Sequence, residues 1–304
     1  MKLGILCPGQ GHQSRAMLDG LQGEPAAQRV LDEATEALRW DPRELILGSE
    51  EALYTNAVAQ PLICVAELAI WTALSTNLPE PCVFAGYSVG ELAAQACAGA
   101  LHAAELAELA RLRASLMDGA CLDDCGLIAV SGLGFQLTER LCAQTGVEIA
   151  IVNGGDRFVT GGRCAALDDF EEAAIGAGAR IQRLPVAVAA HTRLMQPAAR
   201  DFRAALAESP LRDPAVRVLA GVDASSVLTR DRAMDTLARQ VAEPINWAGC
   251  MDALVEAGCT ILLELGPGDA LARLFHSRHA SIPCRSVGEF GSFAGAARWV
   301  AAAA

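Results

Sequence analysis

The sequence predicts an α/β protein with a mainly parallel sheet. Three apolar runs with short glycine-rich exits are typical of buried strands, at residues 3–7, 82–86 and 261–265. Helical patterns at residues 26–38 and 61–78 lie between the first two runs. Because parallel strands need crossover connections, strands that alternate with helices in this way indicate a parallel sheet covered by helices.

The middle of the chain has a different order of elements. Apolar periodicity predicts a strand, a helix, two strands, a second helix and a last strand, at residues 127–131, 135–144, 148–153, 158–161, 164–177 and 180–186. This β-α-β-β-α-β order is the ferredoxin-like arrangement, and the Gly-Gly-Asp-Arg turn at residues 154–157 favours a hairpin between the central strands. We therefore expect a small ferredoxin-like subdomain of residues 126–188, inserted into a large domain of residues 1–125 and 189–304.

Composition excludes several classes of function. The 304 residues carry a net charge of −12 that no basic run offsets, so we expect no nucleic-acid partner. No uninterrupted apolar run reaches the roughly 18–20 residues of a membrane span, and the first strand breaks at Pro8 too early for a secretion signal. The 11 cysteines, with Cys121 and Cys125 the closest pair, lack metal-ligand spacing. The sequence therefore predicts a cytoplasmic protein with reduced thiols, no metal site and no membrane contact, and a monomer is the default expectation.

A glycine-flanked serine follows the second predicted strand. Residues 86–90 read Gly-Tyr-Ser-Val-Gly, which fits the G-x-S-x-G pattern, and a helical pattern begins at Glu91. In this context the pattern is typical of a strained strand-to-helix turn that exposes the serine hydroxyl, with glycines where a Cβ would clash. The helix N-terminus also favours negative charge that develops near the serine. We therefore predict that Ser88 is a nucleophile and that the large domain is α/β-hydrolase-like.

A serine nucleophile needs a base. The candidates are His12, His102, His191, His276 and His279. His102 is expected at the far end of the helix that Ser88 starts, some four turns of about 5.4 Å away, so it points the wrong way. His191 lies where the inserted subdomain rejoins the large domain, a position that suits a base facing a cleft. His276 and His279 lie near the C-terminus, where an α/β-hydrolase keeps its base, and they remain the rival assignment.

The loop after the first strand is a candidate for oxyanion binding. Residues 8–13 read Pro-Gly-Gln-Gly-His-Gln, and the glycines on both sides of Gln10 let the backbone turn and expose its N–H. The amide of Val89, directly after the serine, is the second predicted donor. The loop lacks the G-x-x-x-x-G-K-[ST] pattern, so it is not a phosphate loop.

Two arginines lie on a predicted helix after the nucleophile. Arg111 and Arg113 are two residues apart, so they occupy different faces of that helix. If one is solvated, the other can turn inwards, where a buried guanidinium needs a carboxylate or another acceptor. Residue type alone favours both side chains at the surface.

Together these segments resemble the malonyl-CoA:acyl-carrier-protein transacylase family, which includes the acyltransferase domains of polyketide synthases. The resemblance runs over nearly the whole chain and rests on seven segments in order: residues 8–13, residues 60–62, residues 86–91, Arg113 with Met117, residues 152–161, residues 191–195 and residues 264–268. Arg113 falls 25 residues after Ser88, as the family pattern expects. Single matches of this kind arise by chance, whereas seven in the same order identify a family.

The resemblance implies a two-step acyl transfer. Ser88 would attack the thioester of malonyl-CoA with His191 as general base, while the amides of Gln10 and Val89 hold the oxyanion. The phosphopantetheine thiol of an acyl carrier protein, the implied partner, would then attack the malonyl-serine ester. Arg113 would bind the free carboxylate of the malonyl group, and no permanently bound cofactor is implied. The family orients its histidine through a backbone carbonyl, so no acidic triad member is expected.

Several residues bear on which member of the family this is. Tyr87 stands where most members have His, and with Gln60 it is placed among the substrate-binding residues. Ala189 and Ala190 precede His191 where bacterial fatty-acid enzymes usually carry Pro-Ser. These features leave alternatives open: the malonyl-transfer subunit of malonate decarboxylase, a discrete polyketide-pathway acyltransferase, a serine hydrolase or thioesterase, or a non-catalytic carrier-binding relative.

An acidic carrier protein requires a local basic patch on this acidic chain. Arg193 and Arg200 are seven residues apart, so on one helix after His191 they would share a face, with Arg183 and Arg203 nearby. This hypothesis places a carrier-docking surface at the rim of the expected cleft. The alternative is an ordinary solvated helix face.

Overall fold

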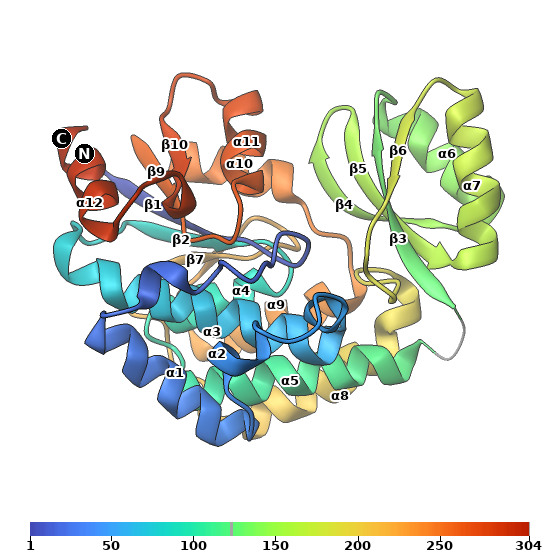
Figure 1. Cartoon of the computed structure of the whole chain (residues 1–304). Helices are drawn as coiled ribbons and strands as arrows, with labels where there is room; N and C mark the ends of the chain where they lie inside the picture. Colours follow the sequence, from blue (N-terminus) through green and yellow to red (C-terminus); the bar gives the residue numbers. More distant parts are fainter. Residues whose placement is uncertain (122–123, 304) are drawn as a thin grey trace.

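The structure is a computed structural model that describes residues 1–121 and 124–303. Within these residues the larger sheet has six strands in the order β10-β9-β1-β2-β7-β8, and only β7 and β8 pair antiparallel (Figure 1). Its strands are β1 (Leu3–Cys7), β2 (Val83–Gly86), β7 (Val218–Leu219), β8 (Ser226–Val227), β9 (Ile261–Glu264) and β10 (Cys284–Ser286). The three strands expected from the apolar runs, β1, β2 and β9, are confirmed with ends within one residue. All their residues are buried, as expected of parallel strands with helices on both faces.

Helices cover both faces of the larger sheet. They are α1 (Pro25–Leu38), α2 (Pro42–Leu45), α3 (Asn56–Leu74), α4 (Gly90–Cys97), α5 (Ala103–Ala120), α8 (Gln196–Glu208), α9 (Arg230–Ala242), α10 (Trp247–Glu256), α11 (Ala270–Arg278) and α12 (Phe293–Ala302). Single 3-10 turns occur at Asp19–Leu21, Glu51–Tyr54, Ser75–Asn77, Arg193–Met195 and Val287–Glu289. α1, α3, α5, α8 and α9 pack against one another on one side, and α10 and α11 lie on the other (Figure 1).

α3 is the central helix of this layer, and it corrects the expected start of a helix at residue 61. It begins five residues earlier, at Asn56, and Pro61 lies inside it. The proline removes one backbone donor, and the helix continues because most of its residues are buried against neighbouring elements. Asn56–Asn77 is long and apolar enough to cross a membrane, with a mean hydropathy of 1.7, but 78% of that segment's apolar window is buried inside the structure. α3 is therefore a core helix.

The chain between α5 and α8 forms a second sheet, with four antiparallel strands in the order β4-β5-β3-β6 among the described residues (Figure 1). In chain order its elements are β3 (Cys125–Ser131), α6 (Phe135–Thr145), β4 (Glu148–Gly154), β5 (Arg157–Arg163), α7 (Cys164–Gly176) and β6 (Arg180–Arg183). This confirms the predicted β-α-β-β-α-β order. β6 ends three residues before the expected residue 186, because Pro185 has no N–H to donate to a ladder. α6 and α7 cover one face of this sheet over a separate small core that contains Phe170.

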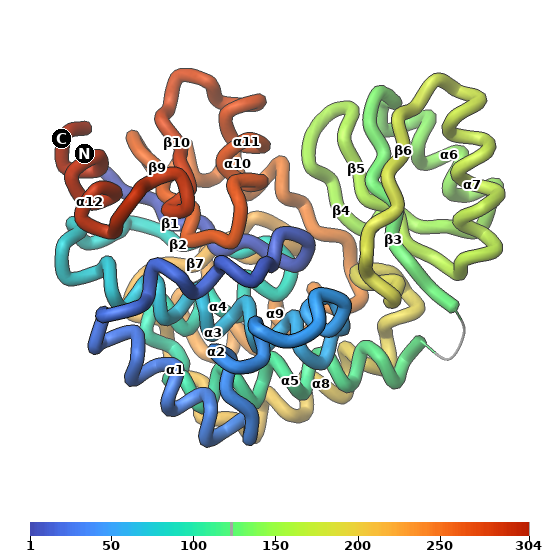
Figure 2. Tube along the Cα trace, in the orientation of Figure 1, coloured from blue at the N-terminus to red at the C-terminus, as the bar shows by residue number. Residues whose placement is uncertain are grey.

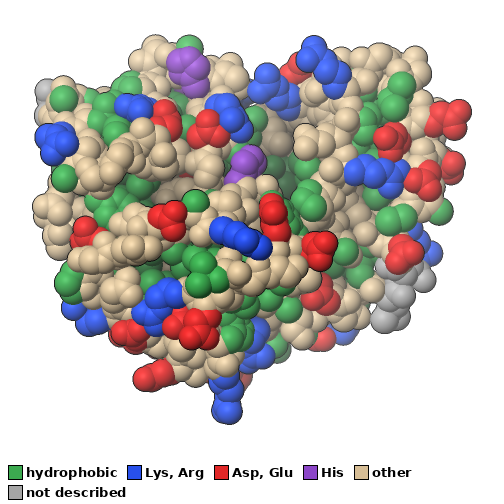
Figure 3. Space-filling view, in the orientation of Figure 1, with side chains coloured by type: hydrophobic (Ala, Val, Ile, Leu, Met, Phe, Trp, Pro, Cys, Tyr) green, Lys and Arg blue, Asp and Glu red, His purple; other side chains and the backbone are tan. Residues whose placement is uncertain are grey.

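Two backbone hydrogen bonds join β4 of the small sheet to the segment around Ile245, which precedes α10. The amide of Val152 in β4 donates to the Ile245 carbonyl at 2.8 Å, and the Ile245 amide donates to the Ala150 carbonyl at 2.9 Å. Figure 2 shows the chain passing to the small sheet after α5 and returning after β6. Figure 3 shows the surface hollowed between the two parts of the molecule. The division into domains at residues 126–188 stays a prediction.

Candidate active site

Ser88 lies on a strained turn between β2 and α4. Its φ is +55°, in the left-handed region that residues with a Cβ rarely adopt. A Cβ on Gly86 would lie 2.2 Å from the Gly90 carbonyl, and a Cβ on Gly90 would lie 2.2 Å from the Cys7 carbonyl oxygen. Both flanking glycines are therefore sterically required, which is the geometry that the G-x-S-x-G pattern predicts.

His191 contacts this serine. The Ser88 Oγ and the His191 Nε2 are 2.8 Å apart, although the two residues are 103 positions apart in the chain. His191 is buried, its own φ is +62°, and its backbone N–H donates to the Val241 carbonyl at 3.0 Å. The His191 Nδ1 is hydrogen-bonded to the backbone carbonyl of Gln240, so Nδ1 carries the proton and Nε2 is free to accept one. The histidine is thus oriented by a backbone carbonyl.

The charge state of His191 suits a base. Burial, together with the nearby Arg113 guanidinium, lowers the pKa of this imidazole to about 3, while the hydrogen bond to Gln240 opposes the shift. The ring is therefore neutral across the physiological range, with the Nε2 lone pair directed at the serine hydroxyl. A neutral imidazole at hydrogen-bond distance can take the hydroxyl proton as the oxygen attacks an acyl group.

The other four histidines, all within the described residues, do not reach Ser88. His12 and His276 are exposed, and His279 is held 2.9 Å from the Asp252 carboxylate. His102 was expected on the helix that follows Ser88, but that helix, α4, ends at Cys97 and Gly99 follows with a φ of +88°. His102 instead starts α5 and is exposed there, so it stays away from the serine for a different reason than its sequence position indicated.

The two expected oxyanion donors lie beside the nucleophile turn. A Cβ on Gly9 would lie 2.6 Å from the Tyr87 carbonyl oxygen, so the loop that carries Gln10 is pressed against the turn that carries Ser88. Among the residues that the structure describes, neither the Gln10 amide nor the Val89 amide donates to a protein acceptor. The Gln10 side-chain nitrogen donates to the Asn56 Oδ1 at 3.0 Å. Two free N–H groups near a serine are what an oxyanion site requires.

Arg113 is buried in α5, with 2% of its surface exposed, whereas Arg111 is exposed. The expectation from residue type, that both arginines are solvated, is wrong for Arg113. Its guanidinium donates to the Gln60 Oε1 at 2.7 Å and to the Gln240 Oε1 at 3.1 Å, and among the described residues no carboxylate binds it directly. Burial lowers the pKa of Arg113 to about 10, so the group stays charged at neutral pH. A buried cation with two neutral partners and further N–H donors is a receptor for an anion.

Gln60 and Tyr87 take up defined positions near this cation and the serine. Gln60 is fully buried in α3, and its amide nitrogen contacts the Met117 sulfur at 3.6 Å, which leaves its oxygen for Arg113. Tyr87 packs edge-on against the buried ring of Trp247, with ring centroids 5.3 Å apart. Burial raises the pKa of the Tyr87 phenol, so it is a neutral group beside the nucleophile.

Gln240 connects the base to the cation, and sequence reasoning missed it. Its backbone carbonyl holds His191, its side-chain oxygen accepts from Arg113, and its side-chain nitrogen donates to Glu91 at 2.6 Å. A glutamine in an amphipathic helix carries no local signal of such a role. The only indication in the sequence is that Gln240 lies on the same face of the helix pattern as Leu237 and Val241, the face that α9 buries.

The arginines of the expected docking surface are already paired. Arg193, Arg200, Arg203 and Arg183 form exposed ion pairs with Glu148, Asp201, Asp235 and both Asp168 and Glu171, respectively. Arg193 lies in a 3-10 turn that precedes α8, so the seven-residue spacing to Arg200 does not put both on one helix face. The spacing argument for a basic patch is therefore wrong. Among the described residues no group of His, Cys, Asp and Glu side chains is placed to hold a metal ion.

The fold and the Ser88–His191 pair have the arrangement expected of an α/β enzyme that uses a serine nucleophile. Residues 5–289 match the acyl transferase domain family, so the chain belongs to that family. It is 34% identical over 292 residues to the malonyl CoA-acyl carrier protein transacylase of Mycobacterium tuberculosis, covering 94% of this chain and 96% of that protein. The corresponding Haemophilus influenzae protein is 30% identical over 302 residues, covering 96% and 97%.

Solved structures show the same likeness. The acyl-carrier-protein S-malonyltransferase of Burkholderia pseudomallei superposes with a TM-score of 0.93 at 31% identity, covering 98% of this chain and all of that one. A malonyl-transacylase solved in complex with its type II polyketide acyl-carrier protein superposes with a TM-score of 0.94 at 28% identity, covering 98% of this chain and 99% of that one. The predicted α/β fold class and the family resemblance are thereby confirmed.

Proposed function

We propose that this chain transfers a malonyl group from malonyl-CoA, through a malonyl ester on Ser88, to the phosphopantetheine thiol of an acyl carrier protein. The names of its relatives, which are malonyl CoA-acyl carrier protein transacylases, support this function. The single observation that carries it is the buried Arg113 guanidinium, which shares a hydrogen-bonded set with His191 through Gln240 and lacks a direct carboxylate partner among the described residues. Such a cation suits an acyl group that ends in a carboxylate.

The first half-reaction forms the acyl-enzyme. The Ser88 Oγ attacks the thioester carbon of malonyl-CoA while the His191 Nε2 takes the hydroxyl proton. The negative charge on the carbonyl oxygen is placed at the free amides of Gln10 and Val89. The C–S bond then breaks, and the CoA thiolate leaves with the proton from His191. The Gln240 carbonyl stabilises the transient imidazolium because it accepts a hydrogen bond from the Nδ1–H.

The second half-reaction reverses these roles. The carrier's thiol loses its proton to His191, its sulfur attacks the ester carbon, and the same two amides hold the oxyanion. The bond to the Ser88 oxygen breaks and the serine regains its proton from His191. Because one base serves both halves, the neutral state of the buried imidazole is needed at the start of each.

Arg113 supplies the preference for a dicarboxylic acyl group in this proposal. A charge-assisted, two-pronged contact with the free carboxylate contributes about 1.5–3 kcal/mol, which corresponds to roughly ten- to 150-fold in rate or affinity. An acetyl group would leave the guanidinium unpaired in a buried site. Gln60 positions the cation for this contact, and Tyr87 forms a neutral wall beside the serine.

The proposal includes no resident cofactor, a monomeric enzyme and a cytoplasmic location, with malonyl-CoA and the carrier as its two substrates. Relatives of this chain include a transacylase solved with a type II polyketide carrier as well as transacylases from several bacteria. The proposal therefore specifies the carrier by its phosphopantetheine thiol and leaves the pathway, fatty acid or polyketide, to experiment. A hydrolase is the alternative that the experiment must separate, because the malonyl-transfer subunit of malonate decarboxylase would form the same malonyl adduct.

The test is the intact mass of the protein after brief incubation with malonyl-CoA or acetyl-CoA. We expect a malonyl adduct on the wild type, none on Ser88→Ala, and little acetyl adduct. Arg113→Ala is expected to lose malonyl labelling selectively, by roughly ten- to 150-fold. Preferential acetyl labelling of the wild type, or release of free malonate with no adduct, would overturn the proposal in favour of another acyl group or a hydrolase.

A further inference from the structure

Glu91, the residue that follows the last glycine of the serine motif, is fully buried in the first turn of α4. Its Oε2 accepts two hydrogen bonds, from the Gly221 backbone N–H at 2.8 Å and from the Gln240 Nε2 at 2.6 Å. None of its side-chain hydrogen bonds reaches Ser88 or Arg113, and the mechanism above does not use the carboxyl group. A buried carboxyl group this close to an active site requires an explanation.

The side-chain amide of Gln240 has one accepting end and one donating end. The accepting end faces Arg113 and the donating end faces Glu91. If the side-chain amide rotated by 180°, its NH2 group would face the Arg113 guanidinium. Two buried donor groups would then lie against each other with no acceptor between them. The acceptor oxygen of Glu91 makes the observed orientation the favourable one.

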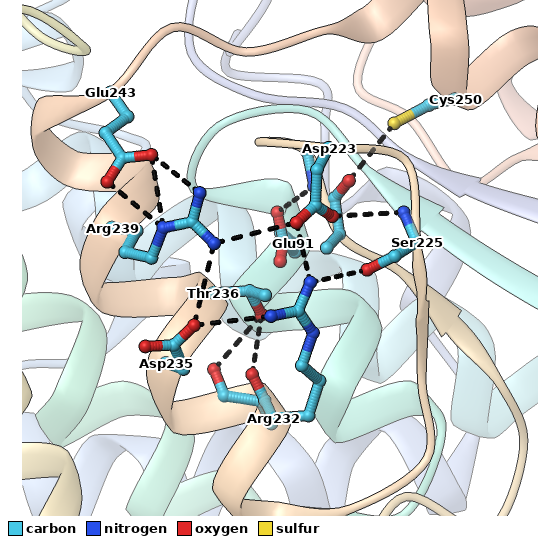
Figure 4. A network of polar contacts seen from close by, with 12 residues as sticks. Glu91, Asp223, Ser225, Arg232, Asp235, Thr236, Arg239, Glu243 and Cys250 are labelled. Carbon is cyan, nitrogen blue, oxygen red and sulfur yellow. Dashed lines mark hydrogen bonds and ion pairs between the residues drawn. The ribbon is translucent and has the colours of Figure 1, made fainter.

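Both partners of the Glu91 oxygen are held by one polar network. Arg232 and Arg239 of α9 contact the Asp223 carboxylate at 2.6 Å and 3.6 Å, and both also contact Asp235 (Figure 4). Asp223 lies two residues after Gly221, and Gln240 follows Arg239 directly. This network ties α9 to the segment that carries the Gly221 amide, so the two groups that Glu91 bridges keep a fixed separation. Figure 4 shows Glu91 beside this network.

The charges agree with this arrangement. Burial raises the pKa of Glu91 to about 7, the hydrogen bonds from Gly221 and Gln240 and the charge of Arg113 oppose the rise, and Asp223 adds to it. The charge of Glu91 in turn favours the protonated form of Arg113. The two groups therefore stabilise each other across the Gln240 amide without direct contact.

We propose that Glu91 is a positioning residue for acyl selection: it fixes the orientation of the Gln240 amide, and through that amide it holds the Arg113 guanidinium ready for the malonyl carboxylate. This inference rests on the proposed function, since it explains how that site distinguishes malonyl from acetyl groups. The oxygen acceptor at position 91, rather than its charge, carries the effect, because an amide is oriented by what it can donate to.

The test compares two substitutions of Glu91 by the ratio of malonyl to acetyl labelling rates on Ser88. Glu91→Gln keeps an oxygen that the Gly221 amide holds in place, so it should retain the wild-type ratio within about three-fold. Glu91→Leu removes the acceptor and should lower the ratio about ten-fold. Glu67→Leu is the matched control, because Glu67 is equally buried and neither of its carboxylate oxygens has a hydrogen-bond partner among the described residues.

Gln240→Met provides an independent route if Glu91→Leu does not fold. It keeps the backbone carbonyl that binds His191 but lacks the amide, so it should lower the ratio as much as Glu91→Leu does, and the double variant should fall no further. An unchanged ratio in Glu91→Leu or in Gln240→Met, or an equal loss in Glu91→Gln, would overturn the inference. Failure of the wild type to form a malonyl adduct would instead overturn the proposed function, so the two failures are distinguishable.

Discussion

The two sheets of this protein differ in the size of the hydrophobic core that each one covers. β1, β2 and β9 of the larger sheet are buried on both faces. Ser88 lies just after β2, and His191 contacts it there. The small sheet has one face covered by two helices and a core of far fewer side chains. Ser88 and His191 both have left-handed backbone, with φ of +55° and +62°, and both lie outside the small sheet, next to the larger core. The candidate site therefore lies in the part of the molecule that has the larger core.

The strongest test of this contrast removes the base. We expect His191→Ala to slow acyl-Ser88 formation by roughly 10²–10⁴-fold, because the serine loses the group that takes its proton. Acyl-enzyme formation from malonyl-CoA, followed by stopped-flow or quenched mass measurement, checks this. His279→Ala is the control: its ring binds Asp252 at 2.9 Å and should matter little. A collapse of activity in His279→Ala, with His191→Ala still active, would revive the hydrolase-type assignment of the base.

A matched pair of core truncations tests the difference between the sheets. Phe170 and Phe84 are both fully buried, Phe170 beneath the small sheet and Phe84 in β2. Each change to Ala should cost about 3–5 kcal/mol. Phe170→Ala should increase amide hydrogen exchange mainly within residues 125–183 while Ser88 still reacts with a fluorophosphonate. Phe84→Ala should loosen the nucleophile strand and lower that reactivity. Equal loss of serine reactivity in both variants would show that the two sheets act as a single unit.

The smallest expected effect concerns pH. The native pKa of His191 is about 3, below the ordinary value near 6.5, so between these values the unfolded chain binds a proton that the native protein does not. The contribution of this residue to the free energy of unfolding therefore falls by about 1.4 kcal/mol for each pH unit below 6.5.

The measurement is denaturant unfolding of the wild type and His191→Ala between pH 7 and 4.5. The difference between the two isolates the histidine from Glu91 and Glu264, whose raised pKa values of about 7 act with the opposite sign over this range. We expect the free energy of unfolding of the wild type, relative to that of His191→Ala, to fall as the pH falls. A pH-independent difference would mean that His191 titrates alike in the folded and unfolded chains.

Much of the fold could be predicted because its signals are local. Buried strands appear as apolar runs, and the β-α-β-β-α-β region appears as alternating periodicities. Ser88 became a candidate through a motif whose glycines the backbone geometry requires, and His191 through its position in the chain; the structure brings the two within 2.8 Å. The remainder depends on contacts distant in sequence. Gln240 lies 49 residues from His191 and 149 from Glu91, and no local pattern records either meeting. The pairing of Arg193 with Glu148 in the small sheet was hidden for the same reason.

The burial of α3 has a consequence for how the chain is made. This helix is apolar enough to pass for a membrane span, and it leaves the ribosome before α4 and α5, two of the helices that pack against it. β1 lies between β2 and β9 in the sheet, so one of its two neighbouring strands is synthesised only in the last third of the chain. The helices that pack most heavily on α3 are complete only at Ala120, so during synthesis this apolar helix stays exposed while roughly 46 further residues (120 − 74) are added, which takes about 2–10 s at 5–20 residues per second. Chaperones that bind apolar segments, and the targeting machinery that sorts membrane proteins, therefore encounter α3 before α4 and α5 have packed against it.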